Sequence, residues 1–100
     1  MKLSAAARVL RSKNAGPLAL TIDILFQSRD SFDLAAGSDA LARSAIARLF
    51  GLPDDDVELT HVPMALAIKL TMPRPIVAGA PGDRDVYGAQ QHRRLLDIDL

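Results

Sequence analysis

Two polar segments carry most of the side chains that could do chemistry. The first runs from Arg11 to Pro17 and places two cations, a hydroxyl and an amide beside a glycine turn. Such groups can hold a carboxylate or phosphate, because arginine binds an oxyanion through two parallel hydrogen bonds and turn amides donate others. The glycine spacing is not that of a P-loop, and a solvated turn between strands is the alternative interpretation. The candidate contact residues here are Arg11, Ser12, Lys13, Asn14 and Gly16.

The second polar segment lies toward the C-terminus and combines carboxylates, a phenol, amides and a histidine. Its candidate contact residues are Gly82, Asp83, Arg84, Asp85, Tyr87, Gln90, Gln91 and His92, and Arg74 is a further cation upstream. Asp83 and Asp85 flank Arg84, so they are expected to pair with arginine, and the spacing is not that of an EF-hand. We therefore expect no metal and no cofactor.

Two residues of that segment are candidates for catalysis. His92 can exchange a proton near neutral pH, and Asp85 is a second possible base. The chain has no cysteine, and no serine lies in a nucleophile-elbow context. A hydrogen-bonded surface histidine is the alternative for His92, and also for His61, which lies at a strand end near Pro63.

The composition describes one small globular domain over residues 1–100. Hydrophobic residues make up 49% of the chain, which argues against disorder. Twelve basic residues offset twelve acidic ones, so no net charge attracts nucleic acid or an anionic membrane. Only four aromatic residues are present, too few for a platform on which bases stack.

The absence of cysteine and of long apolar segments predicts the compartment. Without cysteine there are no disulfides or thiolate metal sites, which is typical of a reducing environment. No run of about 18 apolar residues could span a bilayer, and the N-terminus does not resemble a signal peptide. We expect a soluble, cytoplasmic protein.

Period-two alternation predicts the strands that position the polar segments. It is clearest from Leu18 to Phe26, where five large apolar residues share one face and Asp23 lies on the other. Three more strands are predicted, at 4–10, 57–62 and 65–72. In the segment 4–10 three alanines make a helix the alternative. Residues 95–100 alternate again and are expected to add an edge strand. The first polar run would follow the strand at 4–10.

One main helix is predicted from residue 39 to residue 50. Ser38 supplies a capping hydroxyl, apolar residues recur at three- and four-residue spacing, and Gly51 and Pro53 end the helix. A shorter helical turn is expected at 30–36, and Asp54 to Asp56 would form a solvated turn. Four or five strands with one main helix predict an α+β fold, nearest to a ferredoxin-like sandwich with an antiparallel or mixed sheet.

The two polar segments also resemble a known family. Arg11 to Pro17 followed by Leu20-Thr21-Ile22-Asp23-Ile24, and later Gly82 to His92, are similar to a bacterial and fungal family of unknown function. The segments Ala65-Leu66-Ala67-Ile68-Lys69 and Pro73-Arg74-Pro75 also match, so the resemblance covers nearly the whole chain. Arg93-Arg94 departs from the pattern, in which a small residue and proline often follow the histidine.

The resemblance implies a partner and no reaction. Small members of that family accompany acyclic terpene utilisation A proteins, as neighbours or fused to them. It therefore implies an accessory subunit that completes a site on such a larger protein, with Arg11, Lys13 and Arg74 as anchors for an organic acid or a terpenoid acyl substrate. Two alternatives stay open: a free-standing lyase or hydratase that uses His92 or Asp85 as base and holds a carboxylate with Arg11 or Lys13, and a self-assembling structural module. A homo-oligomer is possible in each case.

Overall fold

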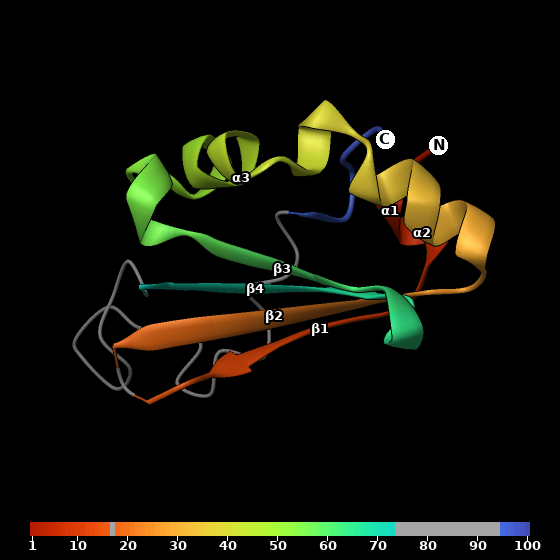
Figure 1. Ribbon diagram of the computed structural model, residues 1–100. Helices are drawn as coiled ribbons and strands as arrows, with labels where there is room; N and C mark the ends of the chain where they lie inside the picture. Colours follow the sequence, from red (N-terminus) through yellow and green to blue (C-terminus); the bar gives the residue numbers. More distant parts are fainter. Residues whose placement is uncertain (17, 74–94) are drawn as a thin grey trace.

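The protein is a two-layer α+β sandwich. A computed structural model describes residues 1–16, 18–73 and 95–100. Its four strands, β1 (Ala7–Asn14), β2 (Ala19–Phe26), β3 (Glu58–Val62) and β4 (Ala67–Pro73), form one antiparallel sheet in the order β1-β2-β4-β3. The helices α2 (Arg29–Ala36) and α3 (Arg43–Phe50) lie over one face of it (Figure 1). The predicted α+β sandwich is thus confirmed at the level of its layers. In chain order, the β1–β2 hairpin comes first, the helices follow, and the β3–β4 hairpin comes last.

The alternation predicted for the second strand is confirmed. Leu20, Ile22, Ile24 and Phe26 are buried on the face that meets the helices, whereas Leu18, the fifth member of the predicted row, is exposed just before β2. Burying each large aliphatic side chain contributes roughly 1.5–3 kcal/mol, so this row is a principal source of stability. On β4, Ile68, Leu70 and Met72 are buried opposite them and complete the centre of the core.

The helical region differs from the prediction of one main helix. Ser38 does cap a helical start, since its hydroxyl accepts a hydrogen bond from the Ala40 amide at 3.3 Å, but that start is the 3-10 turn η1 (Asp39–Leu41). Ala42 is extended and separates η1 from α3. In one continuous helix Leu41 and Ile46 would lie about 140° apart, and the break allows both to be buried. The expected short turn is the full helix α2, as long as α3.

The two chain ends also differ from the prediction. The alanines favour helix at first, giving α1 (Leu3–Ala6), and β1 begins only at Ala7. The predicted edge strand at 95–100 is wrong, because this segment is not assigned as a strand and, with the rest of the described chain, forms only one isolated bridge, between Lys2 and Asp99. It packs on the N-terminus through backbone hydrogen bonds instead, such as Leu3 amide to Ile98 carbonyl at 2.8 Å, and the two ends lie close together in Figure 1.

The first polar run lies in a strand and not in a turn. β1 continues through Asn14, because pairing with β2 satisfies the backbone groups of residues 11–14. The turn itself comes after, where the Ala15 amide donates to the Ala19 carbonyl at 2.9 Å and Gly16 takes a φ of +88°. The two short 3-10 turns η2 (Asp54–Asp56) and η3 (Pro63–Ala65) precede and follow β3, and η2 is the predicted acidic turn.

The glycines that end α3 and α2 differ in backbone conformation, so substituting each tests how much that conformation contributes to stability. Gly51 ends α3 in the left-handed region at φ +69°, whereas Gly37 ends α2 at φ −91°. Gly51→Ala should lower the free energy of unfolding by about 1–2 kcal/mol, because a Cβ is strained in that region. Gly37→Ala should change it little or raise it by up to about 1 kcal/mol. Urea unfolding of both variants measures the difference, and equal effects would contradict this account.

Candidate functional site

The structure describes only the first of the two predicted clusters. Arg11, Ser12, Lys13 and Asn14 lie on β1, and Gly16 lies in the turn that follows. The remaining candidates lie outside the described residues, and their roles stay predictions. These are Arg74, Gly82, Asp83, Arg84, Asp85, Tyr87, Gln90, Gln91 and His92.

The alternation of β1 separates four residues of the first cluster into two pairs on opposite faces, Ser12 with Asn14 and Arg11 with Lys13. Ser12 pairs with the buried Ile22 and is itself buried, so it lies on the face that carries the helices. Arg11 and Lys13 are exposed and lie on the opposite face, which we call the second face. Only these two cations of the predicted cluster therefore share one surface.

Strand register extends that surface into rows that cross all four strands. The first row contains Arg11, Asp23, Lys69 and Thr60. The second row contains Lys13, Thr21, Thr71 and Glu58. A third, apolar row contains Val9, Leu25, Ala67 and Val62. Side chains opposite one another in such rows lie about 4.5–5.5 Å apart at Cβ and interact directly.

An ion pair anchors the first row. Arg11 Nε lies 3.6 Å from Asp23 Oδ2, and the Asp23 side chain is 23% exposed against 67% for Arg11. On its other side, Asp23 is opposite Lys69. Asp23 thus sits between two cations, and Arg11 is already engaged by a carboxylate of its own chain. A substrate carboxylate at Arg11 would have to compete with this pair.

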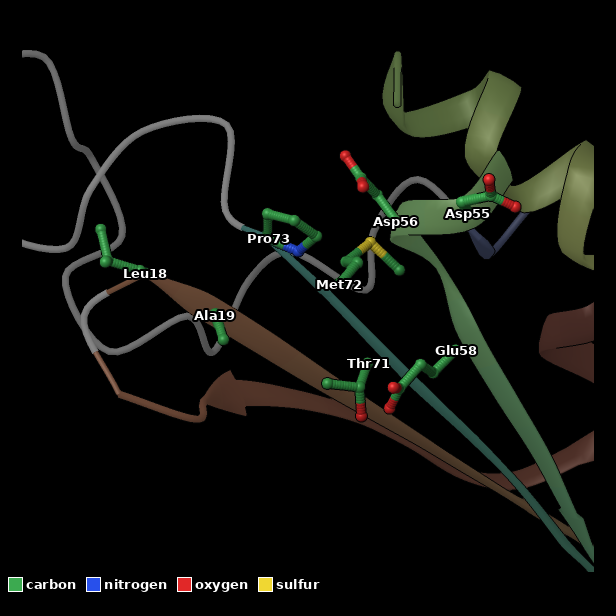
Figure 2. Close-up of a pocket in the computed structure, with 8 residues that line it drawn as sticks. All are labelled: Leu18, Ala19, Asp55, Asp56, Glu58, Thr71, Met72 and Pro73. Atoms are coloured by element: carbon green, nitrogen blue, oxygen red, sulfur yellow. The ribbon is translucent and has the colours of Figure 1, made fainter. Parts of the chain in front are cut away.

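A pocket lies at the end of the sheet where β2 begins and β4 ends (Figure 2). Three carboxylates, those of Asp55, Asp56 and Glu58, are among its lining residues, and Thr71 and Met72 come from β4. The Asp55 Oδ1 atom lies 3.9 Å from the Arg43 Nη2 atom of α3. Arg11, Ser12, Lys13, Asn14 and Gly16, the predicted contact residues that the structure describes, are not among its described lining residues, and the charged residues in that described lining are acidic.

His61 makes a packing contact. Its ring meets that of Phe32 edge to face at a centroid distance of 6.2 Å, and the guanidinium of Arg29 lies 5.8 Å from the Phe32 centroid. This agrees with the structural interpretation of His61. Within the described ranges, no group of three or more histidine, cysteine or acidic residues is placed to hold a metal ion.

The residues that sequence reasoning missed are the neighbours supplied by other strands. The sequence places Asp23 on the less apolar face of its strand, but Lys69, Thr71 and Glu58 belong to no motif. Period-two alternation in 65–72 places Lys69 and Thr71 on the side of their strand opposite its large apolar residues, and it does not single out Glu58. Only the register joins them to Arg11 and Lys13.

No helix among the described residues is both long enough and apolar enough to cross a membrane. The longest, α2 and α3, have eight residues each.

The strength of the Arg11–Asp23 pair can be measured. Because the pair is partly exposed, Arg11→Gln and Asp23→Asn should show a coupling free energy of about 0.2–1 kcal/mol in a double-mutant cycle of urea unfolding. Ile22→Ala, on the other face of the same strand, should cost about 2–5 kcal/mol and is the positive control. A coupling above that range would mean that Arg11 is committed to the fold and is not free to exchange partners.

Comparison with known proteins identifies a family. No curated protein and no solved structure matches the chain. A family model described as a domain of unknown function (DUF4387) matches residues 3–99. The match covers α1, all four strands, both longer helices and nearly all of the C-terminal segment. This chain therefore belongs to the DUF4387 family.

Proposed function

We propose that this protein is an accessory subunit that docks on a larger protein of the acyclic terpene utilisation A type and completes a site there for an organic acid or a terpenoid acyl substrate. The motif resemblance of residues 11–17 and 82–92 supports the choice of partner. The observation that carries the proposal is an apolar projection at the tip of the β3–β4 hairpin, the segment Pro63–Leu66, which we call the hairpin tip.

The hairpin tip presents one apolar side chain completely to solvent. Met64 is fully exposed, with a relative exposure of 101%, and Pro63 and Ala65 beside it are also exposed. A flexible thioether side chain adapts to the shape of a partner surface, which is why methionine is frequent at protein-binding sites. Projecting such a side chain from the end of a sheet suits contact with a larger protein.

The backbone holds the hairpin tip in one conformation. Val62 and Ala67 close the hairpin, and Leu66 takes a φ of 51°, the only positive value on a non-glycine residue among those described. The Leu66 carbonyl accepts a hydrogen bond from the Phe26 amide at 2.8 Å, which ties the tip to the end of β2. A non-glycine residue in this region costs about 1–2 kcal/mol, and such strain is often found where a side chain must be aimed.

A native pull-down from the source cells tests the proposal. The tagged wild-type protein should recover a larger acyclic terpene utilisation A type protein in stoichiometric amount. Met64→Ser should reduce this recovery at least tenfold without changing the melting temperature, because Met64 has no contacts to lose in the free protein. Mass spectrometry of the bound fraction measures the recovery.

Leu18→Ser is the matched control. Leu18 is also an exposed apolar residue, at 63%, but it lies at the opposite end of the sheet. It should leave the recovery unchanged. Recovery of the small protein alone, or turnover of an organic acid by the purified protein without any partner, would contradict an accessory role.

A further inference from the structure

We infer that two copies of this chain form a dimer by pairing their β3 strands antiparallel, edge to edge, about a two-fold axis perpendicular to the sheet. The two sheets would then continue into one, with the helices of both copies on the same side. The inference goes beyond the accessory role proposed above and does not depend on it. The occupant that it names for the β3 edge is the same strand of a second copy.

The β3 edge is accessible to another strand. Among the described residues β3 pairs with β4 alone, so the backbone groups on its other side have no described partner strand. Four of its five residues are exposed, namely Glu58, Thr60, His61 and Val62. In the central strand β2, by contrast, every residue is buried or half-buried.

β3 lacks the features that usually keep an edge strand from pairing. Natural sheets protect their edges with bulges, prolines and charged side chains, lysine above all. β3 contains no lysine, arginine or proline, and its register with β4 is unbroken. Its one carboxylate, that of Glu58, lies at the first position. Thr60 and Val62 are β-branched, which favours strand pairing.

The opposite edge of the sheet, β1, has both kinds of protection. Its register with β2 shifts between Ala7 and Val9, as at a β-bulge. It also carries three exposed cations, Arg8, Arg11 and Lys13. Two copies joined through β3 would therefore expose only protected β1 edges, so that assembly would end at a dimer.

Symmetry restricts the register of the pair. A two-fold axis perpendicular to the sheet keeps each side chain on its own face, and directly opposed residues of antiparallel strands also share a face. One residue must therefore lie opposite itself in the second copy. With Thr60 at the axis, all five residues of β3 are paired. Leu59 then lies opposite His61, and Glu58 lies opposite Val62.

The side chains are compatible with this register. The two Thr60 side chains are opposite one another on the second face, and threonine pairs are favourable across strands. Glu58 and the acidic turn η2 lie at the start of β3, so the antiparallel arrangement keeps the carboxylates of the two copies at opposite ends. The formal net charge of the chain is zero, which adds no long-range repulsion between copies.

The length of the strand indicates a reversible dimer. Five residues span roughly 17 Å, and one strand pair of that length buries less than the roughly 800 Å² per partner of a standard interface. Association should therefore depend on concentration. The paired residues end at Val62, so the hairpin tip that follows is not part of the strand pair.

Charges placed at the axis test the pairing. Sedimentation equilibrium over a range of concentrations should show a monomer–dimer equilibrium for the wild-type chain. Thr60→Asp and Thr60→Lys should each weaken dimerisation at least tenfold, because each places two like charges directly opposite one another. Thr60 is exposed, so circular dichroism and thermal melting should show folded variants.

Mixing the two variants gives the sharpest result. In a mixed dimer an aspartate lies opposite a lysine at the axis, so an equimolar mixture should dimerise at least as strongly as the wild type. Lys13→Asp is the matched control. It places a carboxylate on the same face of the sheet but at the β1 edge, and it should leave dimerisation unchanged.

A cysteine at the axis tests the geometry without a change of charge. The natural chain has no cysteine, so Thr60→Cys carries a single thiol. Directly opposed residues of antiparallel strands have Cα atoms about 4.5–5.5 Å apart, a separation that a disulfide can bridge. Mild oxidation should therefore give a covalent dimer at least ten times faster than with Lys13→Cys, whose thiol lies at the β1 edge.

Four outcomes would overturn the inference. The first is a wild-type chain that stays monomeric at every concentration it tolerates. The second is a dimer that neither charge at Thr60 weakens, which would mean contact through another surface. The third is a mixture of the two charge variants that does not recover. The fourth is oxidation of Thr60→Cys no faster than that of Lys13→Cys, because the two Thr60 positions would then not be opposed.

Discussion

The structure depends on burying one face of the central β2–β4 pair under the helices. Leu20, Ile22 and Ile24 lie opposite Met72, Leu70 and Ile68, and all six side chains are at most 2% exposed. Because side chains alternate along a strand, a slip of one residue would turn every one of them to the opposite face. Core burial therefore determines the register, and the register determines what the second face carries.

The second face acquires its charge pattern as a consequence of that register. Cations lie on β1, one edge of the sheet, and Glu58 lies on β3, the other edge. Between them, Asp23 contacts Arg11 and is opposite Lys69, so charges of both signs continue through the middle. The ion pair of Arg11 with Asp23 is one product of this register, because neither residue carries a signal along the chain that would bring them together.

Membership of the DUF4387 family assigns no reaction. The hairpin tip lies at one end of the sheet, beyond the Val62–Ala67 pair, whereas the charged rows lie on the second face away from that end.

Local patterns in the sequence determined the fold class, the buried row of β2, the strands β3 and β4 and the glycine that ends α3. These features depend on periodicity, capping and turn chemistry within a few residues, which can be seen along the chain. The tertiary structure decided the rest: the extension of β1 through Asn14, the break at Ala42, the contact of the C-terminal segment with the N-terminus, and the meeting of Arg11 with Asp23 and of Asp23 with Lys69. Each of these depends on hydrogen bonding or packing between distant segments, and pairing with a neighbouring strand outweighed the local preference of a polar run for a turn.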